Sequence, residues 1–336
     1  MTDDAVLATS RGGPMSSDLP PVVDALVVGG GPAGLSAATW LGRYWRSTVV
    51  VDAGNQRNLP ADRAHGLLGR DPITPQQLLI DSRAGLEQYP HVALRHGTVS
   101  SLHQDGDGLF HATVGDGEIS AGRVILATGV KDQLPQIVGF SDHYGVDVHH
   151  CPACEGYTAR GQTVIVLGSG AQLPEYAAEL LDWADTVRII NDPTVDGVTD
   201  DQRATLASHE IDVVDGVAES LVGAPGALSG VRLAGGNLVK GGTVFFSYGH
   251  HPVHDLAQQL GCELDHEGRI IVNDFQLTSV DGVYAAGDIT AGLQLIPVAI
   301  GTGTVAGIAC ATSVRGHPTD SPTPHPAPPA NRFAGE

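Results

Sequence analysis

Basic residues are scarce in this 336-residue sequence. It holds 18 Lys and Arg residues against 38 Asp and Glu residues, which gives a formal net charge of −20. A chain this acidic repels phosphate backbones and anionic lipid headgroups, so nucleic acids and membranes are disfavoured as partners. The excess of negative charge also keeps the protein soluble.

Cysteine is equally rare, with four residues at positions 151, 154, 262 and 310. Four cysteines are too few to brace a secreted fold of this length with disulfides. The N-terminal segment MTDDAVLATSRGGPMSSDLPP is acidic near its start and lacks the apolar core of a signal peptide. We therefore expect a cytoplasmic protein.

An uninterrupted hydrophobic run long enough for a membrane span is also missing. The most apolar stretch, residues 296–314, contains three glycines and several threonines. This composition is typical of a buried helix with close neighbours and not of a transmembrane segment. No membrane partner is expected.

The length favours two domains between flexible ends. Residues 1–20 are expected to form a flexible leader, and the Pro-rich residues 315–336 a disordered tail. Between them, strands alternate with helices, as in parallel sheets with crossover helices. The segment GVYAAGDIT and the apolar helix after it return to the first domain. The first domain is therefore expected to be discontinuous (21–130 and 253–314), with residues 131–252 inserted as the second.

The first domain opens with a strand, a glycine-rich loop and a helix. Gly29, Gly31 and Gly34 occupy the three positions of the pattern G-x-G-x-x-G. The first glycine allows the tight turn, the second lets a pyrophosphate approach the backbone, and the third lets helix and strand pack closely. Asp52 ends the next strand, where a carboxylate can accept hydrogen bonds from ribose hydroxyls. The complete pattern predicts a dinucleotide site.

A second unit of the same kind, GQTVIVLGSGAQLPEYAAELL, is incomplete. Gly168 and Gly170 are kept, but Leu173 stands at the third motif position, where Gly or Ala allows close packing. The next strand ends in Asn191-Asp192-Pro193, whose carboxylate would repel a phosphate. The unit is therefore expected to keep its fold without binding NADPH, although NADH stays open because Asp192 lies one residue beyond the usual ribose-binding position.

Between the two units lies the pair Cys151-Pro152-Ala153-Cys154. A Cys-x-x-Cys pair beside a dinucleotide-binding unit indicates a redox dithiol in an intracellular protein. Pro152 suits the first turn of a helix whose positive end would favour a thiolate at Cys151. A zinc site would need two further ligands near the pair, and Cys262 and Cys310 stand alone, so no metal is expected.

Together these motifs resemble the thioredoxin reductase-like flavoproteins. The matching segments are GGGPAG, the Ala-Thr-Gly at 127–129, the Cys-x-x-Cys, FFSYGHHP and the AAGD that ends at Asp288. The resemblance implies an α/β fold of two Rossmann-like domains, each a three-layer ββα sandwich, and FAD as the cofactor. The residues that it places around FAD are Gly29, Gly31, Pro32, Ala33, Gly34, Asp52, Ala53, Arg57, Asn58, His65, Val99, Ala127, Thr128, Gly129, Gly287, Asp288, Leu295 and Ile296.

The resemblance also assigns roles at the dithiol. It implies that Cys151 exchanges with the substrate sulfur and that Cys154 faces the flavin. Glu155 matches the acidic residue that serves as acid or base in thioredoxin reductases, and His149 and His150 are further candidates for proton transfer. The alternatives are that Glu155 is only a charge at a helix start and that the histidines are structural.

The segments DAGNQRN, AHGLLGRD and HHCPACEGY resemble one branch of this family, the FAD-dependent dithiol oxidases of natural-product pathways. Members of that branch close the disulfides of gliotoxin, holomycin and romidepsin. The resemblance implies a small-molecule dithiol as substrate, O₂ as acceptor with H₂O₂ as product, and a homodimer. Glu155 departs from the His that many members carry there. An NAD(P)H-dependent disulfide reductase is the competing hypothesis, and a flavin redox sensor is the third.

Overall fold

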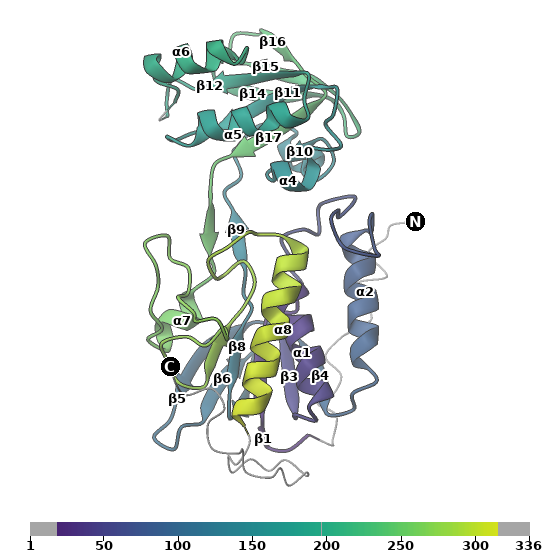
Figure 1. Cartoon of the computed structure of the whole chain (residues 1–336), viewed down its shortest axis with the longest axis vertical. Helices are drawn as coiled ribbons and strands as arrows, with labels where there is room; N and C mark the ends of the chain where they lie inside the picture. Colours follow the sequence, from purple (N-terminus) through teal and green to yellow (C-terminus); the bar gives the residue numbers. More distant parts are fainter. Residues whose placement is uncertain (1–18, 196, 315–336) are drawn as a thin grey trace. The chain divides into compact units, whose positions relative to one another are not determined.

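The computed structural model describes residues 19–195 and 197–314. The tail predicted for residues 315–336 lies outside the described residues, as does nearly all of the leader predicted for residues 1–20. The chain forms two compact units (Figure 1). The first comprises the chain up to Arg57, Gln76–Lys131 and the chain from His251, and the second comprises Asn58–Pro75 and Asp132–His250.

The first unit is built on a five-stranded parallel sheet of order β19-β8-β2-β3-β4. Its strands are Val283–Ala285, Val124–Leu126, Ala25–Val28, Thr48–Asp52 and Val92–His96 in that order. The central strands are apolar throughout because both faces of the sheet are covered. A four-stranded sheet of order β1-β7-β6-β5 shares one hydrophobic core with it. The strands of this second sheet are Val22–Val23, Gly117–Ala121, Phe110–Val114 and Val99–Gln104.

Helices α1 (Pro32–Arg43) and α8 (Ile296–Ser313) pack on each other in the first unit (Figure 1). Glycines make this contact close, because a Cβ at Gly307 would lie 2.6 Å from the carbonyl oxygen of Ala37. By length and composition α8 could cross a membrane. Its buried residues lie on one side at helical spacing, at Ala299, Gly303, Ala306, Gly307, Cys310 and Ala311. The other helices of this unit are α2 (Pro75–Leu86) and α7 (Asp255–Gln259).

The second unit is built on a parallel sheet of order β10-β17-β11-β12-β13. Its strands are Val148–His149, Thr243–Ser247, Thr163–Gly168, Thr186–Asn191 and Asp212–Asp215 in that order. An antiparallel sheet of β14 (Ala218–Ala224), β15 (Ala227–Leu233) and β16 (Leu238–Lys240) shares a hydrophobic core with it. The helices are α3 (Phe140–His143), α4 (Pro152–Glu155), α5 (Leu173–Glu179), the 3₁₀ turn η2 (Leu180–Asp182) and α6 (Asp200–Ser208).

The chain passes between the two units through β9 (Val130–Asp132) and β18 (His250–Pro252), which pair as a two-stranded ribbon. Each unit carries a parallel sheet and a second sheet that share a hydrophobic core; the second sheet is antiparallel in the second unit, and in the first unit it is mixed because β1 pairs with β7 in parallel. The predicted fold class, two Rossmann-like units in an α/β chain, is confirmed.

Candidate functional site

The first glycine loop joins β2 to α1 and leaves no room for side chains. Gly29 has a φ of +108°, and a Cβ there would overlap the carbonyl oxygen of Ala127. A Cβ at Gly34 would overlap the carbonyl oxygen of Gly29, so helix and loop touch backbone to backbone. Strand, loop and helix therefore meet as closely as the motif predicts.

The N-terminus of α1 is available to an anion. Gly31 is the N-cap residue and supplies no side-chain hydrogen bond, Pro32 is the first helical residue, and Ala33 follows. A Cβ at Gly31 would meet nothing closer than the Gln56 side chain at 3.8 Å. Backbone N–H groups at such a helix end favour a pyrophosphate, so the loop fits the dinucleotide moiety of FAD.

Asp52 ends β3 beside this loop and is engaged by two residues that the sequence motif did not reveal. Its carboxylate pairs with Nη2 of Arg83 at 2.7 Å and accepts two 2.9 Å hydrogen bonds from Nε2 of Gln56. A Cβ on Gly30 would lie 2.6 Å from the Asp52 carboxyl carbon, so the carboxylate reaches the glycine loop. Ala53 continues the chain from β3. The position suits a ribose, with the carboxylate held by Arg83 and Gln56.

Residues 127–129 follow β8 at the same sheet edge. The Ala127 N–H donates to the Val28 carbonyl at 2.8 Å, and the Thr128 hydroxyl donates to the Val253 carbonyl at 2.7 Å. Gly129 has a φ of +67° and accepts a hydrogen bond from the Val253 N–H. Val99 begins β5 and is buried. The Thr-Gly pair is thus fixed by the chain that returns to the first unit.

Arg57 joins two residues at the other side of the predicted flavin site. Its Nη1 donates to Oε1 of Gln294 at 2.6 Å and lies 3.4 Å from Oδ2 of Asp288. Gly287, with a φ of +80°, precedes Asp288 and donates its N–H to the Thr302 hydroxyl of α8. Leu295 is the N-cap residue of α8, and Ile296 is its first residue. Gln294, the residue before the N-cap of α8, thus shares Arg57 with Asp288.

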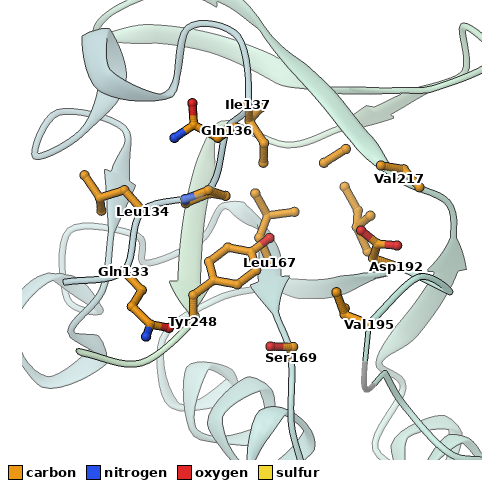
Figure 2. A pocket seen from close by; sticks show the side chains of 13 residues that line it. Gln133, Leu134, Gln136, Ile137, Leu167, Ser169, Asp192, Val195, Val217 and Tyr248 are labelled. Carbon is orange, nitrogen blue, oxygen red and sulfur yellow. The ribbon is translucent and has the colours of Figure 1, made fainter. Parts of the chain in front are cut away.

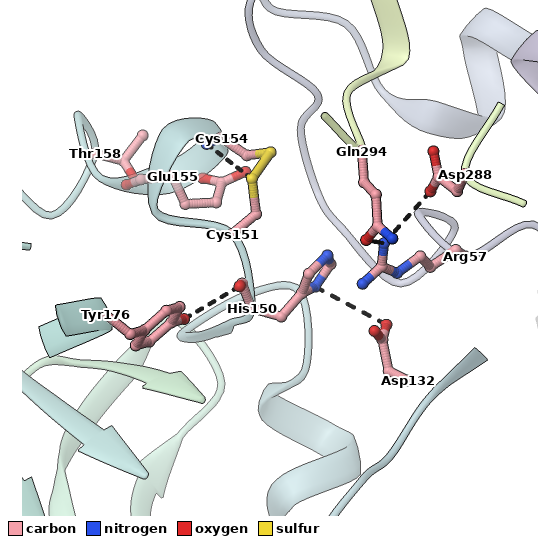
Figure 3. The surroundings of a disulfide bond; sticks show 10 residues. All are labelled: Arg57, Asp132, His150, Cys151, Cys154, Glu155, Thr158, Tyr176, Asp288 and Gln294. Atoms are coloured by element: carbon pink, nitrogen blue, oxygen red, sulfur yellow. Dashed lines mark hydrogen bonds and ion pairs between the residues drawn. A yellow bond between two sulfur atoms is a disulfide. The ribbon is translucent and has the colours of Figure 1, made fainter. Parts of the chain in front are cut away.

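The Cys-x-x-Cys pair lies in the second unit, where Cys151 and Cys154 form a disulfide at the start of the short helix α4 (Figure 3). Cys151 is the N-cap residue, and Pro152 is the first helical residue. The Sγ atom of Cys151 accepts a 3.1 Å hydrogen bond from the Cys154 N–H. After reduction, the same N–H would stabilise a thiolate on Cys151, because a backbone donor favours the charged form of the sulfur.

The three acid–base candidates near the disulfide have different surroundings. Burial raises the pKa of the Glu155 carboxyl, while the His65 charge and a 3.3 Å hydrogen bond from the Thr158 hydroxyl oppose that rise. Burial lowers the pKa of His149 to about 4, so this imidazole is neutral at physiological pH. His150 lies with its Nδ1 4.0 Å from Oδ2 of Asp132. Glu155 can therefore retain a proton at higher pH than an ordinary carboxyl.

Asn58 and His65, which the resemblance placed with Arg57 around FAD, belong to the segment that clusters with the second unit. His65 Nδ1 lies 2.9 Å from Oδ1 of Asp71, and the other oxygen of Asp71 accepts the Gly66 N–H at 2.9 Å. The backbone N–H of Asp62 donates to the carbonyl of Gly145, which ties this loop to the segment before β10. Within the second unit, the electrostatic interaction with His65 lowers the pKa of Glu155.

A hollow of about 390 Å³ lies at the carboxyl ends of β11 and β12 in the second unit (Figure 2). This is the edge at which parallel α/β sheets bind nucleotides. Its lining includes Ser169, Asp192, Val195 and Tyr248, and none of its lining residues is Lys or Arg. Burial and the neighbouring Asp192 charge raise the pKa of Tyr248 to about 12. The hollow therefore offers an anionic ligand no cationic partner.

Leu173 packs beside the glycine loop of the second unit. Its side chain is 1% exposed and belongs to the core under α5. A Cβ at Gly168 would lie 2.9 Å from Cδ1 of Leu173, so the leucine side chain packs directly against the first glycine of this loop. Helix α5 is seven residues long, against 12 in α1. The second loop thus packs on a leucine at its third motif position, while a Cβ at Gly170 would meet nothing within 4 Å.

The other two cysteines, Cys262 and Cys310, are unbridged and buried. Burial raises the pKa of the Cys310 thiol to about 12 and raises that of Cys262 as well. Within residues 19–195 and 197–314, no group of three or more His, Cys, Asp or Glu side chains is placed to hold a metal ion. Burial thus disfavours the thiolate form of both residues.

Comparison with known proteins adds a family match across most of the chain. The family model for pyridine nucleotide-disulphide oxidoreductases matches residues 23–303. The chain is 32% identical over 319 residues to thioredoxin reductase tcpT of Claviceps purpurea, which covers 87% of this chain and 94% of that protein. It is 31% identical to thioredoxin reductase sirT of Leptosphaeria maculans, which covers 86% of this chain and 93% of that protein.

Two solved structures show the same fold. HlmI superposes with a TM-score of 0.83 at 34% identity and covers 87% of this chain and 92% of its own. The putative thioredoxin reductase TrxB of Bacillus anthracis superposes with a TM-score of 0.81 at 27% identity, covering 87% and 98% of the two chains.

Proposed function

The chain belongs to the pyridine nucleotide-disulphide oxidoreductases, and we propose that within this family it is an FAD-dependent dithiol oxidase. In this proposal a small-molecule dithiol is oxidised to a disulfide through Cys151 and Cys154, and O₂ accepts the electrons and becomes H₂O₂. The family supports FAD as the cofactor. The glycine loop, the Asp52 cluster and the Arg57–Asp288 pair are the residues that would hold it.

The observation that carries the proposal is the state of the second nucleotide unit. Leu173 packs against the first glycine of its loop from the core, and Asp192 lines the adjacent hollow at the end of β12. A carboxylate near a phosphate is repulsive, and no Lys or Arg lines the hollow to offset it. Electrons are therefore proposed to enter from the dithiol and not from NADPH.

The disulfide then takes two electrons from the substrate. A substrate thiolate attacks Sγ of Cys151, the Cys151–Cys154 bond breaks, and Cys154 leaves as a thiolate. The second substrate thiolate attacks the substrate sulfur bound to Cys151, forming the product disulfide and releasing Cys151 as a thiolate. When bound, FAD would supply the two-electron acceptor for reoxidation of the pair, with O₂ as the final acceptor. The sum is dithiol plus O₂ giving disulfide plus H₂O₂.

The chain's own residues assist at defined atoms. The Cys154 N–H that now donates to Cys151 Sγ would stabilise the Cys151 thiolate at release. Glu155, whose pKa is raised by burial, can hold a proton beside Cys154 and transfer it to that thiolate after the disulfide has broken. A sulfur whose thiol has a lower pKa is the better leaving group in this exchange.

The test is oxygen consumption and peroxide formation by the purified flavoprotein with a small dithiol such as dithiothreitol. The proposal expects one H₂O₂ for each dithiol oxidised, and loss of at least about a hundredfold in rate for Cys151→Ser and for Cys154→Ser, because each sulfur is needed for exchange. Cys262→Ala, which removes a buried and unbridged thiol, is the matched control and should retain the rate. Full peroxide production by either Ser variant would contradict the proposal.

An NAD(P)H-dependent disulfide reductase is the second candidate. The relatives in Claviceps purpurea and Leptosphaeria maculans carry the name thioredoxin reductase, and Gly168 and Gly170 of the second loop are retained. A flavin redox sensor is a third, which steady dithiol turnover would exclude. The proposal also keeps a cytoplasmic location and a homodimer, to be checked by fractionation of the producing cells and by light scattering.

A further inference from the structure

Of the two histidines before the disulfide, His150 forms an ion pair with Asp132 in the second unit (Figure 3), while His149 is largely buried and feels the charges of Asp147 and Asp62. Its Nδ1 lies 4.0 Å from Oδ2 of Asp132, and its side chain is 29% exposed. The ring packs at centroid distances of 6.0 Å from Phe246 on β17 and 6.4 Å from Tyr144 after α3. His150 is thus half-buried, next to Cys151 in the chain, and directed at an acid.

Asp132 is itself held in place. Its side chain is only 7% exposed, and its Oδ2 accepts a 2.7 Å hydrogen bond from the Tyr144 hydroxyl. A buried carboxylate is costly unless it is hydrogen-bonded and faces a positive charge. Tyr144 supplies the hydrogen bond, and a protonated His150 would supply the charge.

The backbone of His150 is fixed as well. Its carbonyl oxygen accepts a 3.1 Å hydrogen bond from the Tyr176 hydroxyl, which also donates toward the Phe246 carbonyl. Tyr176 is on α5, so the helix of the second glycine unit anchors the chain that enters the disulfide. His149 contrasts with this arrangement, because it packs against Phe245 and its pKa is lowered to about 4 by burial.

We propose that Asp132 is a positioning residue for the dithiol, which holds the imidazole of His150 as a cation beside Cys151. A carboxylate opposite Nδ1 favours the protonated ring over the neutral one. A cation next to a cysteine favours its thiolate. Cys151 is released as a thiolate when the product disulfide forms and must be a thiolate to rebuild the bridge, so the cation serves both steps.

The inference rests on the proposed exchange at Cys151, but not on where the electrons go. It is therefore tested without turnover, in the flavoprotein carrying Cys154→Ser, where Cys151 is the one unbridged cysteine that is not buried among the described residues. The measurement is the rate of Cys151 alkylation by iodoacetamide from pH 5 to pH 10, followed by mass spectrometry. Reaction of the thiolate gives the titration of this sulfur directly.

In that background Asp132→Asn should move the alkylation profile to higher pH and slow alkylation at pH 7 by about threefold or more. His150→Gln should do the same, and Asp132→Asn added to His150→Gln should then change little, because the two residues act through one cation. Asp132→Glu should restore part of the rate, and Tyr144→Phe should give a smaller shift in the same direction.

An unchanged profile in Asp132→Asn, or an equal further shift when Asp132→Asn is added to His150→Gln, would overturn the proposal. An unchanged far-ultraviolet circular dichroism spectrum and urea midpoint in each variant show that the second unit is intact. The outcomes separate this inference from the proposed function. If NADPH reduces the enzyme but the alkylation profile moves as expected, the oxidase assignment fails and the role of Asp132 stands.

Discussion

Asn191 donates a 2.7 Å hydrogen bond from its side-chain Nδ2 to Oδ1 of Asp215 on the neighbouring strand β13. Its Oδ1 accepts a second 2.7 Å hydrogen bond from the Val198 N–H. Both polar ends of this buried residue are therefore used within the protein. The end of β12, beside the hollow of the second unit, is thus tied to its own sheet.

Leu173→Ala should destabilise the second unit by about 2–5 kcal/mol, because the side chain is 1% exposed and its removal leaves a cavity in the core. Leu238→Ala is the matched control, since Leu238 on β16 is 37% exposed. It should cost well under half as much. Urea unfolding followed by far-ultraviolet circular dichroism measures both, and equal losses would show that Leu173 is not a core residue.

Gly34→Ala should yield protein with little or no bound FAD. The added Cβ would overlap the Gly29 carbonyl oxygen, so α1 and the glycine loop would have to separate where the pyrophosphate is expected. Gly301→Ala in α8 is the control, because a Cβ there meets nothing within 4 Å and alanine favours a helix. The flavin-to-protein absorbance ratio measures the outcome, and equal ratios in the two variants would contradict the assignment of the loop.

Glu155→Gln should lower dithiol turnover and remove one ionisation from its pH profile, because the group can no longer carry a proton to Cys154. Thr158→Val tests the direction in which the Thr158 hydrogen bond shifts the pKa of Glu155. The Thr158 hydrogen bond lowers the pKa of Glu155, so its loss should raise that pKa and move the corresponding limb of the profile to higher pH. A shift to lower pH in Thr158→Val would contradict this account of the carboxyl.

His149 should make the second unit sensitive to acid. Its pKa falls from 6.5 to about 4 on burial, so the unfolded chain binds the proton first as the pH drops. This contribution to stability is complete above pH 6.5 and is lost as the pH falls toward 4, by up to about 3 kcal/mol. The difference in unfolding free energy between pH 7 and pH 4.5 should be smaller in His149→Gln than in the parent protein. Equal differences would contradict it.

The two glycine units and the redox pair could be predicted from the sequence because each depends on residues at fixed local spacing. Gly29, Gly34 and Asp52 needed only a strand, a turn and a helix in order, and the fold class followed from two such units. Leu173 was also visible as a departure from the motif. These features are local, so the chain order alone reveals them.

The partners of these residues could not be predicted, because they come from distant segments. Arg83 on α2 binds Asp52 from 31 positions away, and Gln294 meets Arg57 from 237 positions away. Asp132 and Tyr144 belong to no sequence motif, and only the fold brings Asp132 next to His150 and Tyr144 next to Asp132. The division of the histidines into a buried neutral residue and one facing an acid likewise depends on tertiary burial.

The most direct test of the central claim is anaerobic mixing of the yellow protein with NADPH, with NADH, and with a small dithiol. The absorbance of oxidised flavin at about 450 nm reports electron entry in each case. The account predicts that the dithiol bleaches the flavin while NADPH does not, and that admitting air restores the colour with formation of H₂O₂. Rapid bleaching by NADPH would contradict it and make the protein a disulfide reductase.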